Sequence, residues 1–164
     1  MNTDNSGHGT DHSGLRHFRE GGSFEDQAGY SRAVRSGRLI AVSGTTCRPE
    51  FAARDTRAQT EDCLRRVIAA VERLGGGRTD IVRTRLFLTP DADWQTATSV
   101  HREMLGDVAP ANTTLFVHAL IGPDLLVEVE AEAWVSGPGG ASEATGATGT
   151  EPATGAAPEP GRTP

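Results

Sequence analysis

The sequence predicts an α+β domain in which one mixed β-sheet carries two helices on one face. Residues 57–74 and 94–105 repeat apolar side chains at helical spacing, with mostly polar and charged side chains between them. Residues 125–135 instead alternate between apolar and other side chains, which is typical of a strand buried on one face. With further strands between these segments, the predicted order is strand, helix, strand, helix, strand, strand.

Composition places the folded domain at residues 24–135 of the 164-residue chain. Residues 1–23 are polar and rich in Gly, Ser, Asp and His, and residues 136–164 are Gly, Pro, Ala, Ser, Thr and Glu with one Arg. Neither end has enough bulky apolar residues to offset the entropy of ordering it. We therefore expect a disordered head and a disordered tail around a single domain.

The first half of the domain is predicted from local signals. Residues 30–34 are expected to add a strand, and residues 38–43 form a short strand that ends at Gly44. The apolar stripe of residues 57–74 predicts a long helix, which the three glycines of residues 75–77 terminate.

The second half follows in the same way. Residues 81–88 form a strand, and Asp91 or Asp93 caps the helix that follows it. Residues 112–120 are interpreted as a third strand, and residues 121–124 as the turn into the last strand.

The two C-terminal strands predict a polar sheet face opposite the helices. The last strand directs Glu128, Glu130 and Glu132 to this face. The strand before it is expected to add four side chains to the same face: Asn112, Thr114, Phe116 and His118. Phe116 and Trp134 would then be exposed in a monomer, so a partner chain is expected against this face.

Charge and composition exclude several classes of function. The net charge of −6 and the pI near 5.3 argue against nucleic acid as the main partner. No apolar run is long enough to span a membrane, and the N-terminus lacks the regions of a signal peptide. Cys47 and Cys63 lack metal-ligand spacing, which favours a reduced, cytoplasmic protein without a metal.

The absence of Lys excludes further kinds of chemistry. All 16 basic residues are Arg, which excludes a lysine Schiff base, the usual attachment of pyridoxal phosphate and a P-loop. The sequence also has neither a GxSxG nor an HExxH motif. We therefore expect chemistry without a cofactor.

Five short segments, in order along residues 28–135, carry a resemblance to a known family. They are Ala28-Gly29-Tyr30-Ser31-Arg32-Ala33-Val34, Val42-Ser43-Gly44, Ile81-Val82-Arg83-Thr84, Pro110-Ala111-Asn112-Thr113-Thr114 and Leu126-Val127-Glu128-Val129-Glu130-Ala131. They are similar to the Gly-Pro-Tyr-Ser-x-Ala-Val opening, Ser-Gly turn, third strand, Pro-Ala-Arg segment and Leu-Val-Glu-Ile-Glu-Ala strand of the Rid (YjgF/YER057c/UK114) family. The chain thus resembles a Rid protein.

The resemblance implies a chorismate-mutase-like fold and a homotrimer whose sheets face inward, with ligand clefts between subunits. It also implies hydrolysis of reactive enamines and imines to a keto compound and ammonia. The family's Arg after Pro-Ala holds the substrate carboxylate, and Asn112 stands at that position here. Asn has neither the charge nor the forked donors of Arg, so small 2-imino acids are not the expected substrates.

The resemblance assigns catalysis to Glu130, with Tyr30 lining the cleft. Glu130 lies in a row of glutamates that disfavour each other's ionisation, so it could activate water as a base. The alternative is a solvated row of charges. Tyr30 would orient the substrate, or else be an ordinary packed aromatic residue.

Other candidates surround this pair as substrate-binding residues. The backbone at Ser43 and Gly44 could donate N–H groups to a developing negative charge, or could form only a turn. Asn112, Thr114 and His118 would line the cleft, although His118 is more often a histidine at a surface rim. Arg83 and Arg85 share one strand face. They are expected either to replace the missing guanidinium or to pair with the glutamate row.

Three functions remain open from the sequence. The first is enamine or imine hydrolysis, and the second is proton transfer, tautomerisation or cyclisation of a larger intermediate on the same scaffold. The third is a trimer that binds a small metabolite or a protein without catalysis. A shared fold does not choose between them.

Overall fold

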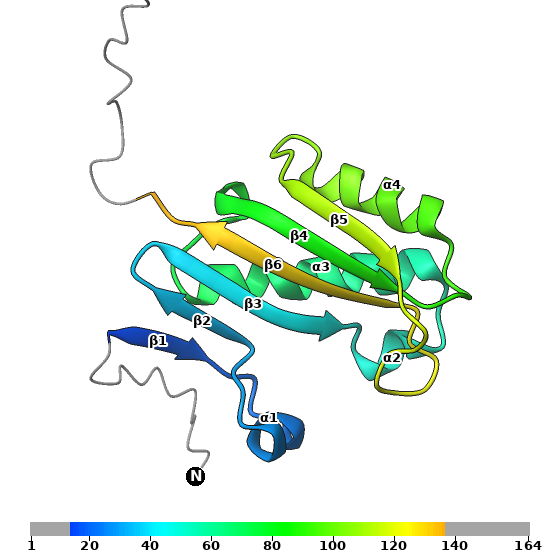
Figure 1. Cartoon of the computed structure of the whole chain (residues 1–164), viewed down its shortest axis with the longest axis horizontal. Helices are drawn as coiled ribbons and strands as arrows, with labels where there is room; N and C mark the ends of the chain where they lie inside the picture. The colour runs from blue at the N-terminus through cyan, green and yellow to red at the C-terminus, as the bar shows by residue number, and fades with distance from the viewer. Residues whose placement is uncertain (1–13, 137–164) are drawn as a thin grey trace, which may run out of the picture.

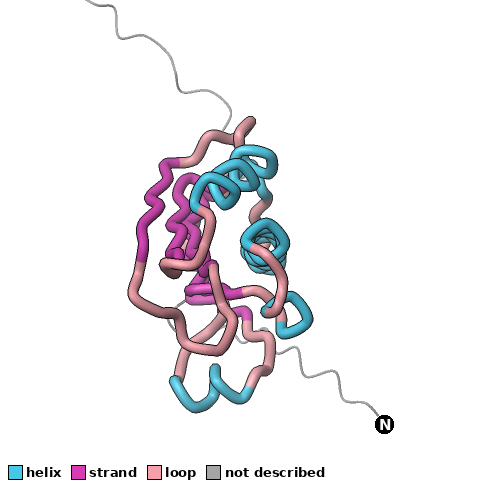
Figure 2. Tube along the Cα trace, turned by 90° about the vertical axis from the view of Figure 1, so that its right-hand side faces the viewer, coloured by secondary structure: helices cyan, strands magenta, loops and turns pink. Residues whose placement is uncertain are grey.

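The computed structural model describes residues 14–136, which form one six-stranded sheet covered on one face by two long helices (Figures 1 and 2). The elements are β1 (Leu15–Phe18), α1 (Ser23–Ala28), β2 (Ala33–Ser36), β3 (Leu39–Thr46), α2 (Pro49–Ala52), α3 (Thr56–Arg73), a 3-10 turn (Arg78–Asp80), β4 (Ile81–Leu88), α4 (Trp94–Leu105), β5 (Ala111–Phe116) and β6 (Val127–Trp134). The predicted α+β class, with α3 and α4 behind a mixed sheet, is confirmed.

The strand order is β1-β2-β3-β6-β4-β5, so the last strand lies in the middle of the sheet. Strands β4 and β5 are parallel and are joined by α4, whereas every other neighbouring pair is antiparallel. A helical crossover is the usual way to connect parallel neighbours. The sheet thus has β1 at one edge and β5 at the other.

The core forms between β6 and the helices, as its alternation predicts. Val127, Val129, Ala131 and Ala133 are almost fully buried, and the glutamates between them lie on the opposite face. Strand β6 packs against α3, whose buried side chains include Leu64, Val67 and Val71. Burial of this apolar surface is the main favourable contribution to folding.

Two aspartates set the starts of the long helices. Asp55 accepts a hydrogen bond from the Ala58 N–H, and Asp93 accepts from the N–H groups of Gln95 and Thr96. These caps satisfy backbone donors that have no partner within the helix. Of the two candidate caps for the second helix, Asp93 is therefore confirmed.

Several element limits differ from those predicted, and the strand expected at residues 30–34 is β2 at Ala33–Ser36. Residues 15–18, assigned to the disordered head, form strand β1 by pairing with β2; residues 1–13 and 137–164 lie outside the described residues. Strand β3 continues through Gly44 to Thr46 instead of ending there. Strand β5 ends at Phe116, so His118 lies in the following loop and not on a strand face.

The predicted face of β5 is wrong. Asn112 pairs laterally with Thr84, whose buried hydroxyl bonds to His101 of α4, so the Asn112 side chain lies on the helix side of the sheet. Phe116 has the same parity as Asn112 and therefore lies on the side opposite the glutamate row. Phe116 and Trp134 are exposed, at 54% and 49%, but on different faces. They do not form one patch for a partner chain.

Gln59 ties the loop before β6 to the start of α3. Its fully buried amide donates to the carbonyls of Ala52 and Asp124, each at 2.8 Å, and weakly to that of Arg54. Its carbonyl accepts from the Leu126 N–H at 2.8 Å. One side chain thus satisfies buried backbone groups from two separate loops.

Replacing Gln59 with Leu should lower the free energy of unfolding by roughly 2–4 kcal/mol, although Leu is more apolar, because buried backbone groups lose their partners. Chemical denaturation would measure the change. Gln95→Leu, on the exposed side of α4, is the matched control and should change it by less than about 0.5 kcal/mol. Equal effects at the two positions would contradict the role of Gln59.

Candidate functional site

A cavity of about 200 Å³ lies where α1, β3, β6 and the loop after β5 meet. It is lined by Phe24, Tyr30, Arg32, Gly44, Thr46, Ile121 and Glu128. Of the residues expected to share a cleft, it brings together Tyr30 and Gly44. The carboxylate beside them belongs to Glu128 and not to Glu130.

A β-bulge in β3 makes room for this carboxylate. Val42 pairs with Ala131 and Thr45 with Val129. Strand β3 therefore has one more residue than β6 between these two pairs, which defines a bulge. A Cβ atom at position 44 would overlap the carboxylate oxygen of Glu128. Glycine at this position therefore allows Glu128 to lie over the β3 backbone.

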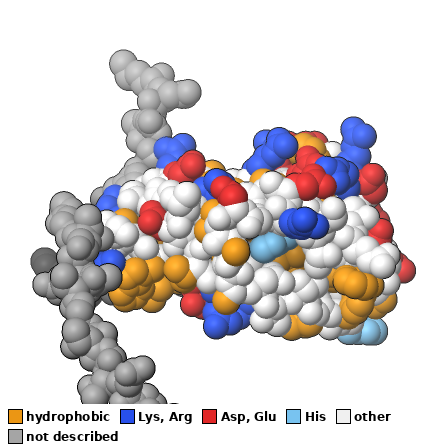
Figure 3. Space-filling model, turned by 90° about the horizontal axis from the view of Figure 1, so that it is seen from above, with side chains coloured by type: hydrophobic (Ala, Val, Ile, Leu, Met, Phe, Trp, Pro, Cys, Tyr) orange, Lys and Arg blue, Asp and Glu red, His pale blue; other side chains and the backbone are white. Residues whose placement is uncertain are grey.

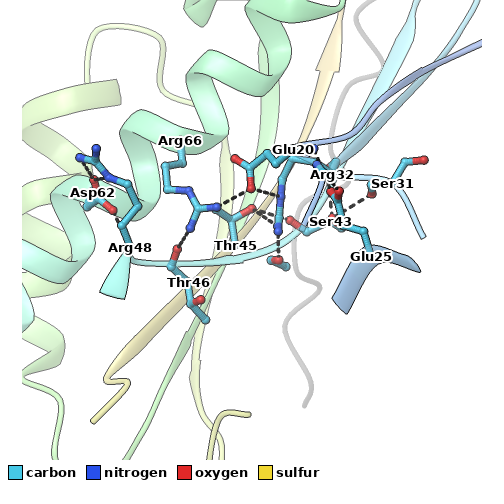
Figure 4. Close-up of polar contacts among 12 residues, drawn as sticks. Glu20, Glu25, Ser31, Arg32, Ser43, Thr45, Thr46, Arg48, Asp62 and Arg66 are labelled. Atoms are coloured by element: carbon cyan, nitrogen blue, oxygen red, sulfur yellow. Dashed lines mark hydrogen bonds and ion pairs between the residues drawn. The ribbon is translucent and has the colours of Figure 1, made fainter. Parts of the chain in front are cut away.

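Ser43 and Arg32 hold the bulge in place (Figure 4). The Ser43 hydroxyl donates to the carbonyls of Ser31 and Arg32, at 3.2 and 3.0 Å, and the Ser43 N–H also donates to the Arg32 carbonyl. The Arg32 guanidinium donates to the Gly44 carbonyl at 2.7 Å and to the Thr45 hydroxyl at 3.1 Å. The hydroxyl and N–H of Ser43 thus serve the backbone and are not directed to a substrate.

The Arg32 side chain is buried and paired with Glu20, which precedes α1. Its Nε lies 3.3 Å from a Glu20 oxygen, and Arg66 of α3 contacts the same carboxylate at 2.5 Å (Figure 4). Its Nη2 donates to the Tyr30 hydroxyl at 3.4 Å. A buried cation needs such partners, and here they also fix the phenol of Tyr30 at the cavity.

Glu128 is half-buried, and its environment favours the protonated form. Desolvation raises the pKa of its carboxyl above the ordinary value, the charge of Glu130 raises it further, and Arg32 partly opposes the rise. No hydrogen bond within residues 14–136 involves this carboxylate. A carboxyl group of this kind can act as an acid or a base toward a ligand in the cavity.

Glu130 lies on the same face but in an ion-paired row. Its carboxylate is 3.3 Å from Arg85, which also contacts Glu132 at 3.2 Å, and Arg83 lies 3.9 Å from Glu132. The expectation that Arg83 and Arg85 pair with the glutamates is confirmed, so their charge is already balanced within the chain. The catalytic role of Glu130 stays a prediction.

The remaining predicted residues lie in other cavities. Asn112 and Thr114 line a cavity of about 310 Å³ between β5 and α4, on the helix side of the sheet. His118 lines a third cavity of about 590 Å³ beside the β4–α4 loop. A single chain therefore does not unite these residues with Tyr30 and Glu128.

The described part of the chain suggests neither a metal site nor a membrane span. Within residues 14–136, no three His, Cys, Asp or Glu side chains are grouped as metal ligands. No helix of this region is long and apolar enough to cross a bilayer. Cys47 and Cys63 are buried free thiols, and burial raises the pKa of each.

The fold and the cavity define a class of small α+β protein in which a bulge in one strand of the sheet supports a cavity lined by a half-buried carboxyl group. Comparison with known proteins identifies the family. The chain belongs to the family described as Endoribonuclease L-PSP, whose model matches residues 22–135. Similar solved structures include members of the YjgF/YER057c/UK114 family, so the predicted Rid membership is confirmed.

Three relatives illustrate the similarity. Rv2704 of Mycobacterium tuberculosis is 41% identical, with a TM-score of 0.69 over 74% of this chain and 99% of that chain. SCO2049 of Streptomyces coelicolor, an uncharacterized protein, is 30% identical over 73% of this chain and 92% of its own length. Escherichia coli TdcF, solved with bound serine, is 26% identical, with a TM-score of 0.59 over 65% and 88% of the two chains.

The raised pKa of Glu128 predicts a pH-dependent stability. The folded chain keeps this proton at a higher pH than the unfolded chain, so stability falls as pH rises from about 4.5 through the folded pKa. Glu128→Gln removes this loss of folding stability at high pH, because glutamine does not titrate. The melting temperature of the variant relative to wild type should therefore be more favourable at pH 8 than at pH 4.

Thermal unfolding of both proteins at several pH values would measure this difference. Glu72→Gln, the same change at an exposed position of α3, should show no such trend. If the difference in melting temperature between Glu128→Gln and wild type is the same at every pH, the Glu128 carboxyl has the same pKa in the folded and unfolded chains, which would contradict the prediction.

Proposed function

We propose that this protein hydrolyses an enamine or imine, releasing ammonia and a carbonyl compound, with Glu128 as the acid–base residue. The observation that carries the proposal is a half-buried carboxyl with a raised pKa, in a small cavity beside the Tyr30 hydroxyl. Membership of a family for which the resemblance implies this reaction supports it. The assignment moves the catalytic carboxylate from Glu130 to Glu128.

The cavity provides the groups that the reaction needs. Ionised Glu128 takes a proton from water as the water oxygen bonds to the imine carbon, and returns that proton to the nitrogen. Glu128 then transfers the proton of the new hydroxyl to the nitrogen as the C–N bond breaks, which leaves a carbonyl compound and ammonia. Tyr30 orients the substrate through its hydroxyl, and for an enamine the protonated Glu128 supplies a proton to carbon.

The arrangement of the residues favours a site completed by assembly. Tyr30 and Glu128 line the cavity beside β3 and the central strand β6, whereas Asn112 and Thr114 belong to β5. Strand β5 forms one edge of the sheet (Figure 1). The family resemblance implies a homotrimer with ligand clefts between subunits, and we propose that in it the cavity of one subunit adjoins the β5 edge of the next. Asn112 and Thr114 then bind the part of the substrate remote from the reacting carbon.

The charges of the chain favour substrates other than small 2-imino acids. Asn112 supplies no charge for a carboxylate. Arg83 and Arg85 are engaged by the glutamate row, and most Arg32 donors serve the bulge and Tyr30. We do not propose RNA cleavage, despite the family's description, because a net charge of −6 opposes binding to a phosphate backbone.

An imine-hydrolysis assay tests the proposal. An amine oxidase or an amino-acid oxidase generates imines in situ, semicarbazide competes for them, and the carbonyl product and ammonia are measured. Glu128→Gln should lower kcat/KM by about 10²–10⁴-fold. Glu130→Gln and Glu132→Gln, on the same strand face, should keep it within a few-fold.

The outcomes separate the candidate functions. Loss of activity in Glu130→Gln with retention in Glu128→Gln would restore the assignment made from the sequence. No acceleration with any imine would reject hydrolysis. Ligand-induced thermal stabilisation without turnover would instead support a binding trimer.

Gly44→Ala should disable the site without unfolding the protein. The added methyl group displaces the end of the Glu128 side chain, which can rotate away, so kcat/KM should fall at least about 10-fold while the far-UV spectrum is retained. Gly22→Ala, where a Cβ meets open space, is the matched control. Full activity in Gly44→Ala would show that the position of Glu128 over the bulge is not required.

A further inference from the structure

The cavity at the β5 edge is mainly apolar and has no charged lining residue. Its lining residues are Leu88, Trp94, Thr98, Asn112, Thr114, Leu115 and Phe116. Its volume of about 310 Å³ is within the range of small-molecule sites. Figure 3 views the molecule from the side of α4 and β5, where apolar side chains gather in patches between charged ones.

One amide lies inside this apolar cavity, and its orientation is fixed. The Asn112 Nδ2 donates to the Thr84 hydroxyl at 3.0 Å, and its Oδ1 accepts from the Thr114 hydroxyl at 2.9 Å. Thr84 is fully buried and bonds to His101 Nε2 at 2.8 Å. One amide hydrogen and one lone pair of Asn112 remain for a ligand.

His101 and Asp93, the ionisable groups next to Thr84 and Trp94, supply no positive charge to the cavity. Burial lowers the pKa of His101, which therefore stays neutral near pH 7. Asp93, adjacent to Trp94, uses its carboxylate to bond the first turn of α4. A carboxylate placed here would lose water without gaining an ionic partner, which is unfavourable.

Two aromatic side chains border the cavity and remain accessible. Trp94 and Phe116 are 52% and 54% exposed, although both belong to well-packed elements. Large aromatic side chains supply apolar contact area to a ligand, with an added preference for other aromatic rings. Trp94 and Asn112 thus offer a ligand one aromatic contact and one hydrogen-bonding amide.

We propose that this cavity binds the uncharged, aromatic end of the substrate, with Asn112 hydrogen-bonding one polar atom of it. The substrate class is then an aromatic imine or enamine without a carboxylate. This inference rests on the proposed function, since the reacting carbon must reach Glu128 in the assembled protein.

Binding of two probes of nearly equal size tests the cavity independently of turnover. Phenylacetamide is uncharged and phenylacetate is anionic, and titration calorimetry with the full chain measures both. Wild type should bind phenylacetamide at least about 10-fold more tightly. Asn112→Arg should reverse this preference, because it places a guanidinium beside the aromatic residues.

Two further variants locate the effect. Trp94→Ala should weaken phenylacetamide binding about 10-fold while the protein stays folded. Gln95→Arg adds the same charge as Asn112→Arg, on the exposed side of α4, and should leave the preference of the wild type unchanged.

The result that overturns the inference is equal binding of the probes, no binding of either, or no change of preference in Asn112→Arg. A change of oligomeric state in Trp94→Ala, without a change in probe affinity, would also overturn it, by assigning these aromatics to a subunit contact. Selective phenylacetamide binding in a protein that hydrolyses no imine would keep the cavity assignment and reject the proposed function alone.

Discussion

The single extra residue in β3 is the constraint on which the candidate site depends. The core fixes the parity of β6, since its valines and alanines must face the helices, and this directs Glu128 to the opposite face, where its carboxylate lies over β3. A regular β3 would place a side chain against that carboxylate. The bulge instead brings a glycine there and turns its carbonyl to Arg32. The geometry of the cavity is thus a consequence of core packing on the other face of the sheet.

The same bulge links the charges of the N-terminal segment to the site, because Arg32 contacts both the bulge and Glu20. Arg32 and Arg66 lie on either side of Glu20, and this group leaves one positive charge near the cavity when all three are ionised. Glu128 supplies the opposing charge, although its burial resists ionisation. Each buried charge of this group has a partner of opposite charge on another segment, which offsets the cost of its desolvation. Since Arg32 also lowers the pKa of Glu128, the residues around α1 influence the protonation of a carboxylate on β6.

Sequence periodicity predicted the limits and faces of elements in which one pattern dominates. It failed to predict the face of a strand whose two sides have similar side chains. Strand β4 and helix α4 have the predicted limits, and the alternation of β6 assigns its faces correctly. Strand β5 mixes polar and apolar side chains on both faces, so its parity is set by lateral pairing with β4, which no local pattern reveals. The bulge has no periodic signature either, and without it Glu128 cannot be distinguished from Glu130. Arg32 was missed because its role depends on a carbonyl twelve residues away in the bulge.

The central place of β6 has a consequence for how the protein is made. Among the elements of residues 14–136 this strand is synthesised last, yet both β3 and β4 need it as their neighbour. Before it emerges, β3 and β4 lack the strand that lies between them, so the β1–β2–β3 meander and the β4–α4–β5 unit each have an unpaired edge strand. The two halves join only when residues from opposite ends of the domain meet, and such non-local pairing is slow. Newly made chains therefore pass through a stage in which association with other chains competes with completion of the sheet.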